Sequence, residues 1–329
     1  GTIPALYSEG KTSIYYTYKI KAVKDIIRTR KKGDTSERAN LLICGDLSGI
    51  QQFIYNISSQ NALKNLRARS FFIELLSEHI VQRILDFFHL HRIHLLFSGG
   101  GSFYILLDNQ DDSCKKLAEI THPLETWFAE QFNGRLYAAI TSVPFSDENL
   151  KSHFGSVIED AAHNLFTEKQ AKFKRLIGTG KFEFLQKCDP SYNGCEICFK
   201  DDEALHQDKD GFYRCSYCQT LIEIGALLPK AKYVYKSAKS SENSIFIENS
   251  HYILTDEKYP VNSYDIVWKI CKELSELEGV YKEESIPLIS PYTRLTKDLP
   301  IKDEIKKREN FLKEMLQKDG VDDKVRTEI

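Results

Sequence analysis

Short apolar runs and long amphipathic segments alternate through residues 41–144, and their order limits the folds open to this chain. A strand-length run at 41–48 precedes a helical pattern at 61–89, where apolar residues recur at steps of three to four. Two more strand-length runs, 92–98 and 102–108, are separated only by glycines. Glycine adopts the positive φ of tight turns at no steric cost, so these two runs are expected to form a hairpin.

A second helix is expected at 113–132, and the pair Asn133-Gly134 turns the chain into a last strand at 135–144. The resulting order is βαββαβ, that of the ferredoxin-like fold, in which helices cover one face of a four-stranded antiparallel sheet. We therefore expect an α+β protein with a ferredoxin-like palm domain at 41–146. A fold of this kind serves many functions and names none by itself.

Two cysteine pairs with CxxC spacing give the clearest chemical signal. Cys195 and Cys198 are followed, after 16 residues, by Cys215 and Cys218. A CxxC turn directs two thiolates at one ion, and two such turns complete the four-thiolate site of structural zinc. The alternative, two redox pairs, requires a thioredoxin-like context that is missing. The pattern predicts a four-cysteine zinc ribbon at 188–222, closed to catalysis because protein ligands fill every position.

The composition fits a globular protein of a reducing compartment. The 329 residues are 42% hydrophobic and 12% aromatic, and no run reaches the ~18 apolar residues of a membrane span. Four further cysteines are scattered singly and no secretion signal is visible, so we expect a cytoplasmic protein without a membrane partner. The net charge of −2 does not indicate a bulk electrostatic attraction to nucleic acid. The basic run 19–32 is either a contact to a phosphate backbone or a solvated surface.

The end of the first strand is a candidate phosphate site. Asp46, Ser48 and Gly49 stand there, just before a helix expected to begin at Ile50 or Gln51. Backbone N–H groups at a helix start attract phosphate, and small residues allow a close approach. The same residue types also cap helices that bind no ligand, so both interpretations stay open.

The glycine turn is the second candidate. Palm enzymes that join nucleotides carry carboxylates on this turn, where they hold two metal ions. In this chain Gly101 and Ser102 stand in those positions, so the turn is kept and the metal ligands are lost. The full set of candidate nucleotide-binding residues is Asp46, Ser48, Gly49, Gly99, Gly100, Gly101 and Ser102.

The remaining segments complete the expected organisation. A basic segment at 1–40 precedes the palm, and a helical domain at 147–187 follows it. The packing stripe of that helical domain is expected to be Ile158, Ala162, Leu165 and Phe166. After the zinc ribbon, residues 223–329 are expected to form an α+β connector and a charged helical tail.

Four motifs occur in a characteristic order: GDLSGIQQFIY, NLRARSFFIELL, SGGGSFYILL and the paired CxxC. Together they make residues 41–235 resemble the large subunit of type III CRISPR effector complexes, most closely subtype III-A. The resemblance implies a first palm with a degenerate glycine turn, then a helical domain, a zinc domain and a second palm with a Gly-Gly-Asp-Asp turn. It also implies a guide RNA complex that makes cyclic oligoadenylates from ATP, often with an HD nuclease domain.

The chain departs from that family in two respects. It contains no His-Asp dipeptide and no Gly-Gly-Asp-Asp, and only about 95 residues follow Tyr235, too few for a second palm. A split subunit, a natural minimal form and a truncated form remain open as explanations.

We therefore expect an antiviral subunit that is not catalytic alone and contributes half of an ATP pocket. A second palm, on another chain or a missing segment, would complete the pocket, where ATP and Mg²⁺ would bind. The zinc would be structural. Its expected partners are the other type III effector subunits, guide RNA and target RNA. The alternatives are a stand-alone palm-type nucleotide cyclase and a zinc-ribbon RNA-binding module.

Overall fold

A computed structural model describes most of the chain between residues 38 and 289. The described ranges are 38–55, 62–132, 134–180, 194–196, 205–207, 211–241, 244–257, 266–271 and 286–289. The basic run 19–32, Cys198 and the charged tail predicted after residue 289 lie outside these ranges.

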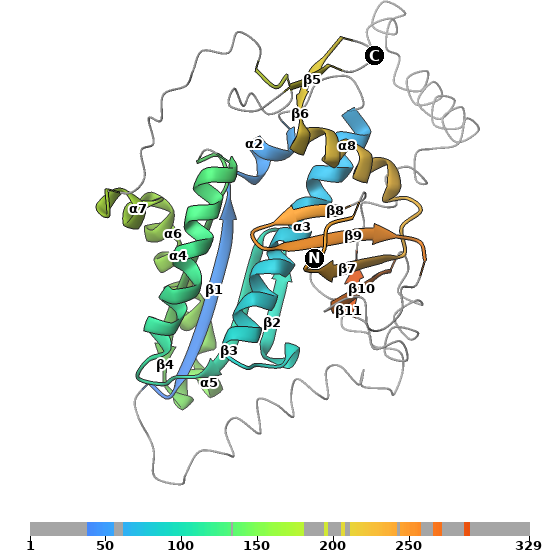
Figure 1. Ribbon diagram of the computed structural model, residues 1–329. Coiled ribbons are helices and arrows are strands. Elements are labelled where there is room, and N and C mark those ends of the chain that lie inside the picture. The colour runs from blue at the N-terminus through green and yellow to red at the C-terminus, as the bar shows by residue number, and fades with distance from the viewer. Residues whose placement is uncertain are drawn as a thin grey trace, which may run out of the picture.

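Four antiparallel strands form the first sheet (Figure 1). Their order across the sheet is β2-β3-β1-β4. The strands are β1 (Asn40–Ser48), β2 (Leu95–Gly99), β3 (Ser102–Asp108) and β4 (Tyr137–Phe145). The long helices α3 (Ala62–Phe87) and α4 (Ser113–Phe132) follow β1 and β3 in the chain, so the predicted order of elements is present. The start of the predicted strand at 92–98 is instead a short 3-10 helix, Arg92–His94.

The two faces of this sheet are covered by different helices (Figure 1). Helices α3 and α4 lie on one face. On the other face lie α5 (Asp147–Ser152) and α6 (Phe154–Gln170), and α7 (Lys174–Gly178) follows them. The buried residues of α6 belong to the same hydrophobic core as β1, so residues 154–170 pack as part of the unit built on the first sheet.

The packing stripe of α6 differs by one residue from the predicted one. The buried side chains are Val157, Ala161 and Leu165, whereas Phe166 is 61% exposed. Of the four predicted residues, Leu165 is buried and Ile158 is partly buried against the same core, whereas Ala162 is exposed like Phe166. Both stripes satisfy helical periodicity, and contact with the sheet selects between them.

A second sheet and a small hairpin follow in the chain. The hairpin pairs β5 (Leu205–Gln207) with β6 (Tyr213–Cys215), and α8 (Ser216–Leu227) begins directly after it. The predicted boundary at residue 222 therefore falls inside a helix. The second sheet has the order β11-β10-β7-β9-β8. Its strands are β7 (Tyr233–Ser237), β8 (Ser244–Ile247), β9 (Ser250–Thr255), β10 (Ile266–Cys271) and β11 (Ile286–Ile289).

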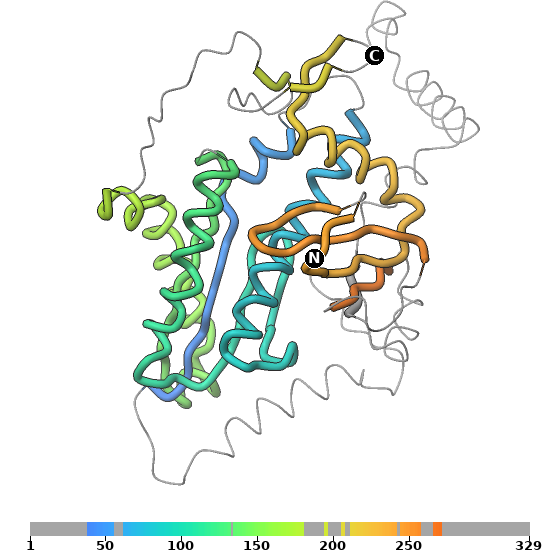
Figure 2. The backbone as a smooth tube through the Cα atoms, in the orientation of Figure 1, coloured from blue at the N-terminus to red at the C-terminus, as the bar shows by residue number. Residues whose placement is uncertain are grey.

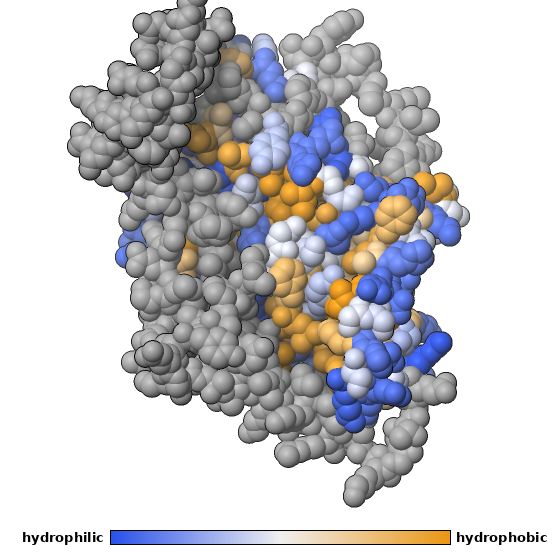
Figure 3. Space-filling model, turned by 180° about the vertical axis from the view of Figure 1, so that it is seen from behind, coloured by the Kyte–Doolittle hydropathy of each residue, from blue (hydrophilic) through white to orange (hydrophobic). Residues whose placement is uncertain are grey.

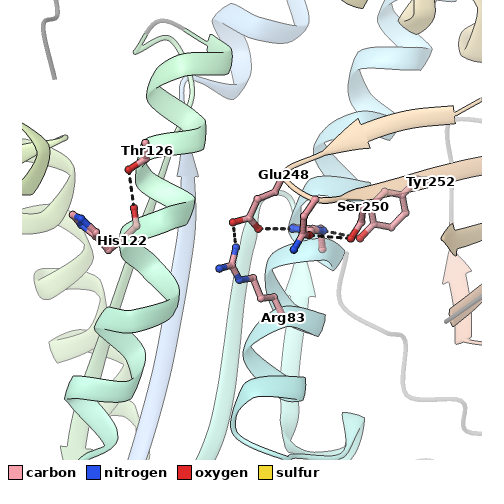
Figure 4. Close-up of polar contacts among 8 residues, drawn as sticks. Arg83, His122, Thr126, Glu248, Ser250 and Tyr252 are labelled. Carbon is pink, nitrogen blue, oxygen red and sulfur yellow. Dashed lines mark hydrogen bonds and ion pairs between the residues drawn. The ribbon is translucent and has the colours of Figure 1, made fainter. Parts of the chain in front are cut away.

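Helix α3 lies between the two sheets (Figure 2). Glu78 of α3 is buried, forms an ion pair with Arg92 at 2.7 Å and accepts a hydrogen bond from the indole of Trp268 in β10 at 3.4 Å. One turn further, Arg83 forms an ion pair with Glu248, in the turn between β8 and β9 (Figure 4). Because these groups are charged or polar and mostly buried, they fix the orientation of the two sheets as well as their contact.

His79 of α3 is buried in the same interface. Its Nδ1 lies 2.7 Å from the hydroxyl of Tyr252, and its Nε2 lies 3.1 Å from Glu248. Burial, and to a lesser degree the charges of Lys236 and Arg83, lowers the pKa of His79 to about 3. A neutral ring satisfies both contacts, since Nε2–H donates to the carboxylate and Nδ1 accepts from the tyrosine.

The surface seen from behind mixes apolar and charged residues, with hydrophobic residues gathered near the centre of the described part (Figure 3). Two large hydrophobic side chains, Phe166 of α6 and Ile177 of α7, are more than half exposed. None of the helices within the described ranges combines the length and apolar character needed to cross a bilayer.

Candidate functional site

Asp46 is the centre of the first candidate site. It stands near the end of β1, directly opposite Ser102 of β3, and opposite residues of an antiparallel pair point to the same face of a sheet. The Ser102 hydroxyl donates to Asp46 Oδ1 at 2.6 Å. On the other carboxylate oxygen, Oδ2, the ammonium group of Lys169 from the last turn of α6 forms an ion pair. Both oxygens of this carboxylate are therefore engaged by the chain itself.

The glycine turn lies beside this carboxylate and is fixed to β1. The backbone N–H of Leu47 donates to the carbonyl of Gly101 at 2.9 Å. Gly101 has φ +89°, a conformation that strains any other residue, and a Cβ there would lie 2.4 Å from Ile50 Cδ1 and displace that side chain. Gly100 also has a positive φ but is exposed, with open space around it, and Gly99 is buried at the end of β2. Gly100 and Ser102 are therefore the solvent-accessible residues of the turn, while Gly101 is packed against Ile50.

The helix after β1 begins at Ile50, one of the two predicted positions. It is α2 (Ile50–Tyr55) and has only six described residues, so its dipole contributes little attraction for phosphate. Gly49 has φ +92°, and a Cβ there would lie 1.9 Å from the carbonyl oxygen of Arg135. Glycine at 49 is thus required by the backbone with or without a ligand. Ser48 is half-buried opposite Tyr137 of β4.

The second candidate site is a cluster of buried cysteines. The sulfur atoms of Cys195, Cys215 and Cys218 lie within 4.8 Å of one another, and each residue is at most 1% exposed. The backbone N–H of Cys218 donates to Cys215 Sγ at 3.4 Å, so a main-chain donor faces this sulfur. Leu205, Tyr217 and Ile222 form an apolar shell around the three residues.

These residues fit a tetrahedral metal ion. Sulfurs bound to one zinc at about 2.3 Å lie about 3.8 Å apart, a spacing compatible with the observed cluster. Three of the four predicted ligands are brought together, and the fourth, Cys198, lies outside the described residues. Cys44 is not among them: it is a buried residue of β1, and burial raises the pKa of its thiol to about 12.

Sequence reasoning missed two basic residues at these sites. Lys169 is 123 positions from Asp46, and its own segment reads as an ordinary charged helix. Arg69 of α3 reaches Cys218 Sγ at 3.6 Å from a separation of 149 positions. No local pattern identifies such pairs. The only signal was that Arg69 occurs in the NLRARSFFIELL motif, where an arginine stands among residues expected to be buried.

Comparisons with known proteins show which proteins this chain resembles. Residues 39–187 match the family model described as Csm1 subunit domain B. The chain is 34% identical over 212 residues to the CRISPR system single-strand-specific deoxyribonuclease Cas10/Csm1 (subtype III-A) of Thermococcus onnurineus. The matched region covers 62% of this chain and 27% of that protein. The chain spans about a quarter of the length of the curated relatives it matches.

Solved structures show the same relationship. The chain superposes on a chain of a Csm1–Csm4 subcomplex of the type III-A interference complex with 25% identity and a TM-score of 0.58. The match covers 83% of this chain and 34% of the other chain. It also superposes on a chain of a Csm1–Csm4 cassette in complex with AMPPNP, with 26% identity and a TM-score of 0.52. That match covers 73% of this chain and 29% of the other chain. These findings confirm the resemblance stated from the motifs: residues 39–187 match domain B of the Csm1 subunit, and the chain is similar to part of the large subunit of type III-A effector complexes.

Proposed function

We propose that this chain is the first-palm and zinc-bearing part of a type III-A CRISPR large subunit, and that it forms one wall of an ATP pocket used to make cyclic oligoadenylates. The sheet order β2-β3-β1-β4 with helices after β1 and β3 supports a ferredoxin-like palm. The related Csm1–Csm4 cassette that binds AMPPNP supports a nucleotide as the ligand.

One observation supports the part of the proposal in which the chain alone does not join nucleotides. The only carboxylate among the candidate nucleotide-binding residues is that of Asp46, and Ser102 and Lys169 already engage both of its oxygens. Nucleotide joining on a palm requires carboxylates that hold metal ions at the attacking and leaving oxygens. A second palm with an acidic turn, on another chain or segment, would have to supply these carboxylates and their Mg²⁺.

The chain's own residues would then bind and orient the nucleotide. Ser48 and Ser102 offer hydroxyl groups, and exposed Gly100 allows a base or phosphate to approach the backbone. Lys169 places a positive charge beside the turn, where a phosphate would lie. In this arrangement Asp46 holds Lys169 and Ser102 in position instead of binding a metal.

The cysteine cluster would bind structural zinc as a ribbon, with Cys198 as the fourth ligand. The other partners in this proposal are the remaining type III effector subunits, guide RNA and target RNA, in the cytoplasm. The relationship to the Csm1 of solved Csm1–Csm4 complexes supports the effector subunits among these partners.

Co-purification of the chain with the neighbouring subunits and guide RNA tests this assignment. The native chain should elute with the complex, and Ser48→Trp should assemble equally well but abolish ATP-dependent signalling. Asp111→Trp is the matched control, because Asp111 is exposed in the loop after β3, beyond the end opposite the turn. A chain that stays monomeric beside those partners would leave only a zinc-ribbon module.

A further inference from the structure

Arg69 occupies an unusual position between the palm and the cysteine cluster. It is only 2% exposed, and its guanidinium makes three contacts. Nη2 donates to Cys218 Sγ at 3.6 Å, and Nη1 donates to the carbonyl oxygen of Phe53 in α2. The guanidinium carbon also lies 4.9 Å from the centre of the Phe53 ring.

The charge of this arginine needs a counter-charge. A guanidinium stays ionised when buried, and an unpaired buried charge is strongly destabilising. No carboxylate pairs with Arg69 in the part of the chain that the structure describes. Cysteine ligands of a metal are deprotonated, and three or four thiolates around one Zn²⁺ leave the centre negative overall. The thiolate centre is thus the anion that this buried cation faces.

The same arginine connects that centre to the helix beside Asp46. Phe53 packs on Phe72 of α3 and Phe132 of α4, with ring centres 5.6 and 5.9 Å away, so α2 is part of the palm core. Helix α8, which carries Cys218, also packs closely on α3, because Arg67 donates to the carbonyl of Gly225 in α8 at 2.9 Å. A Cβ on Gly225 would lie 2.2 Å from the carbonyl oxygen of Lys64, which shows how closely α8 approaches α3.

We propose that Arg69 and the metal–thiolate centre act as one ion-paired unit that holds α2 against the palm. Arg69 is a positioning residue that strengthens metal binding by donating to a thiolate ligand. By thermodynamic linkage, the metal in turn stabilises α2, next to the glycine turn. The metal therefore contributes to order at the candidate nucleotide site, beyond holding the cysteine loops.

The test uses two readouts on the full chain, neither of which depends on catalysis. The first is transfer of zinc to a chromogenic chelator. Arg69→Met should lose zinc about 10- to 100-fold more readily than the native protein. Arg67→Met is the matched control: it removes a second buried arginine of α3 that contacts a carbonyl and no sulfur, and it should stay within about threefold.

The second readout is hydrogen exchange of α2 in the native sequence, which needs no variant to fold. Removing zinc should speed exchange at the Phe53 amide, which donates to Gly49 O, while amides of β1 keep their protection. Unchanged exchange in α2 after zinc removal would overturn the proposal. Equal zinc loss from Arg69→Met and Arg67→Met would also overturn it, and neither result would affect the proposed role in nucleotide binding.

Discussion

The Ser102 hydroxyl donates to the Asp46 carboxylate at 2.6 Å, across the pair of strands that carries the glycine turn. A palm that joins nucleotides needs an acid at the turn to share metal ions with the strand carboxylate. Here a neutral hydroxyl faces that carboxylate, and Lys169 supplies the positive charge that a metal would bring. Under the proposed function, this relationship is what distinguishes a palm that only holds a nucleotide from one that joins nucleotides.

Replacing the hydroxyl by a second carboxylate should create a metal site. Ser102→Asp places two carboxylates on directly opposite residues, an arrangement that binds a divalent ion and repels without one. We expect Mg²⁺ to raise the melting temperature of this variant by several degrees relative to EDTA, because a ligand that binds only the folded state stabilises it. The native protein and the uncharged control Ser102→Asn should not respond. A Mg²⁺ response of the native protein would show that Asp46 binds metal already.

The two glycines of the turn should differ in tolerance. Gly101→Ala brings a Cβ to 2.4 Å from Ile50 at φ +89°, and we expect a loss of about 1–3 kcal/mol in the free energy of unfolding. Gly100→Ala meets no atom within 4 Å at φ +63° and should cost about 1 kcal/mol or less. Denaturant unfolding of both variants measures the difference. Equal costs would mean that contact with Ile50 does not determine the residue at 101.

The interface between the sheets should show a pH dependence that originates at His79. Its pKa is about 3 in the folded chain and near its ordinary value of about 6.5 when unfolded, so between these values only the unfolded chain binds the proton. The contribution of neutral His79 to the free energy of unfolding is complete above about pH 6.5 and is lost as the pH falls toward the folded-state pKa. From about pH 7.5 to about pH 5.5 the loss should be about 1 kcal/mol.

Glu74 acts in the opposite direction, because burial and the nearby Glu78 carboxylate raise its pKa to about 7. The diagnostic quantity is therefore the difference between the native protein and His79→Gln, measured by urea unfolding at both pH values. The variant should be less stable at the higher pH and should lose less stability on acidification. Parallel curves for the two proteins would contradict a neutral, buried His79.

Metal content should follow the cysteine cluster. We expect about one zinc per chain by elemental analysis, and Cys215→Ser should lose it. Cys114→Ser is the control, since Cys114 is an exposed thiol of α4 outside the cluster. A natively purified, folded protein without zinc would exclude the ribbon, and zinc retained in Cys215→Ser would exclude this residue as a ligand.

Local signals predicted the strands, the hairpin and the long helices of the first sheet well. Each of these elements is encoded by periodicity and glycine within its own segment: β3 was expected at 102–108 and spans Ser102–Asp108. The register of the α6 stripe was shifted because Ile158 and Val157 are both apolar, and the sheet that selects between them lies elsewhere in the chain.

The same limit applies to the candidate sites. The three described cysteines are brought together as CxxC spacing predicts, because that chemistry is local. Lys169 and Arg69, which set the charge at the two sites, were missed, because each meets its partner through folding across more than 100 residues. A basic residue on a helix has the same local pattern whether it faces water or a buried carboxylate.

The central claim is that this chain forms half of a nucleotide site, and reconstitution of oligoadenylate synthesis tests it most directly. The purified chain would be incubated with ATP and Mg²⁺, alone or with a partner that carries a Gly-Gly-Asp-Asp palm, guide RNA and target RNA. The products would be identified by mass spectrometry. We predict no oligoadenylates from the chain alone, synthesis with the partner present, and loss of synthesis with Ser48→Trp but not with Asp111→Trp. Oligoadenylates made by the chain alone, or synthesis by the assembly that Ser48→Trp leaves unchanged, would contradict this account.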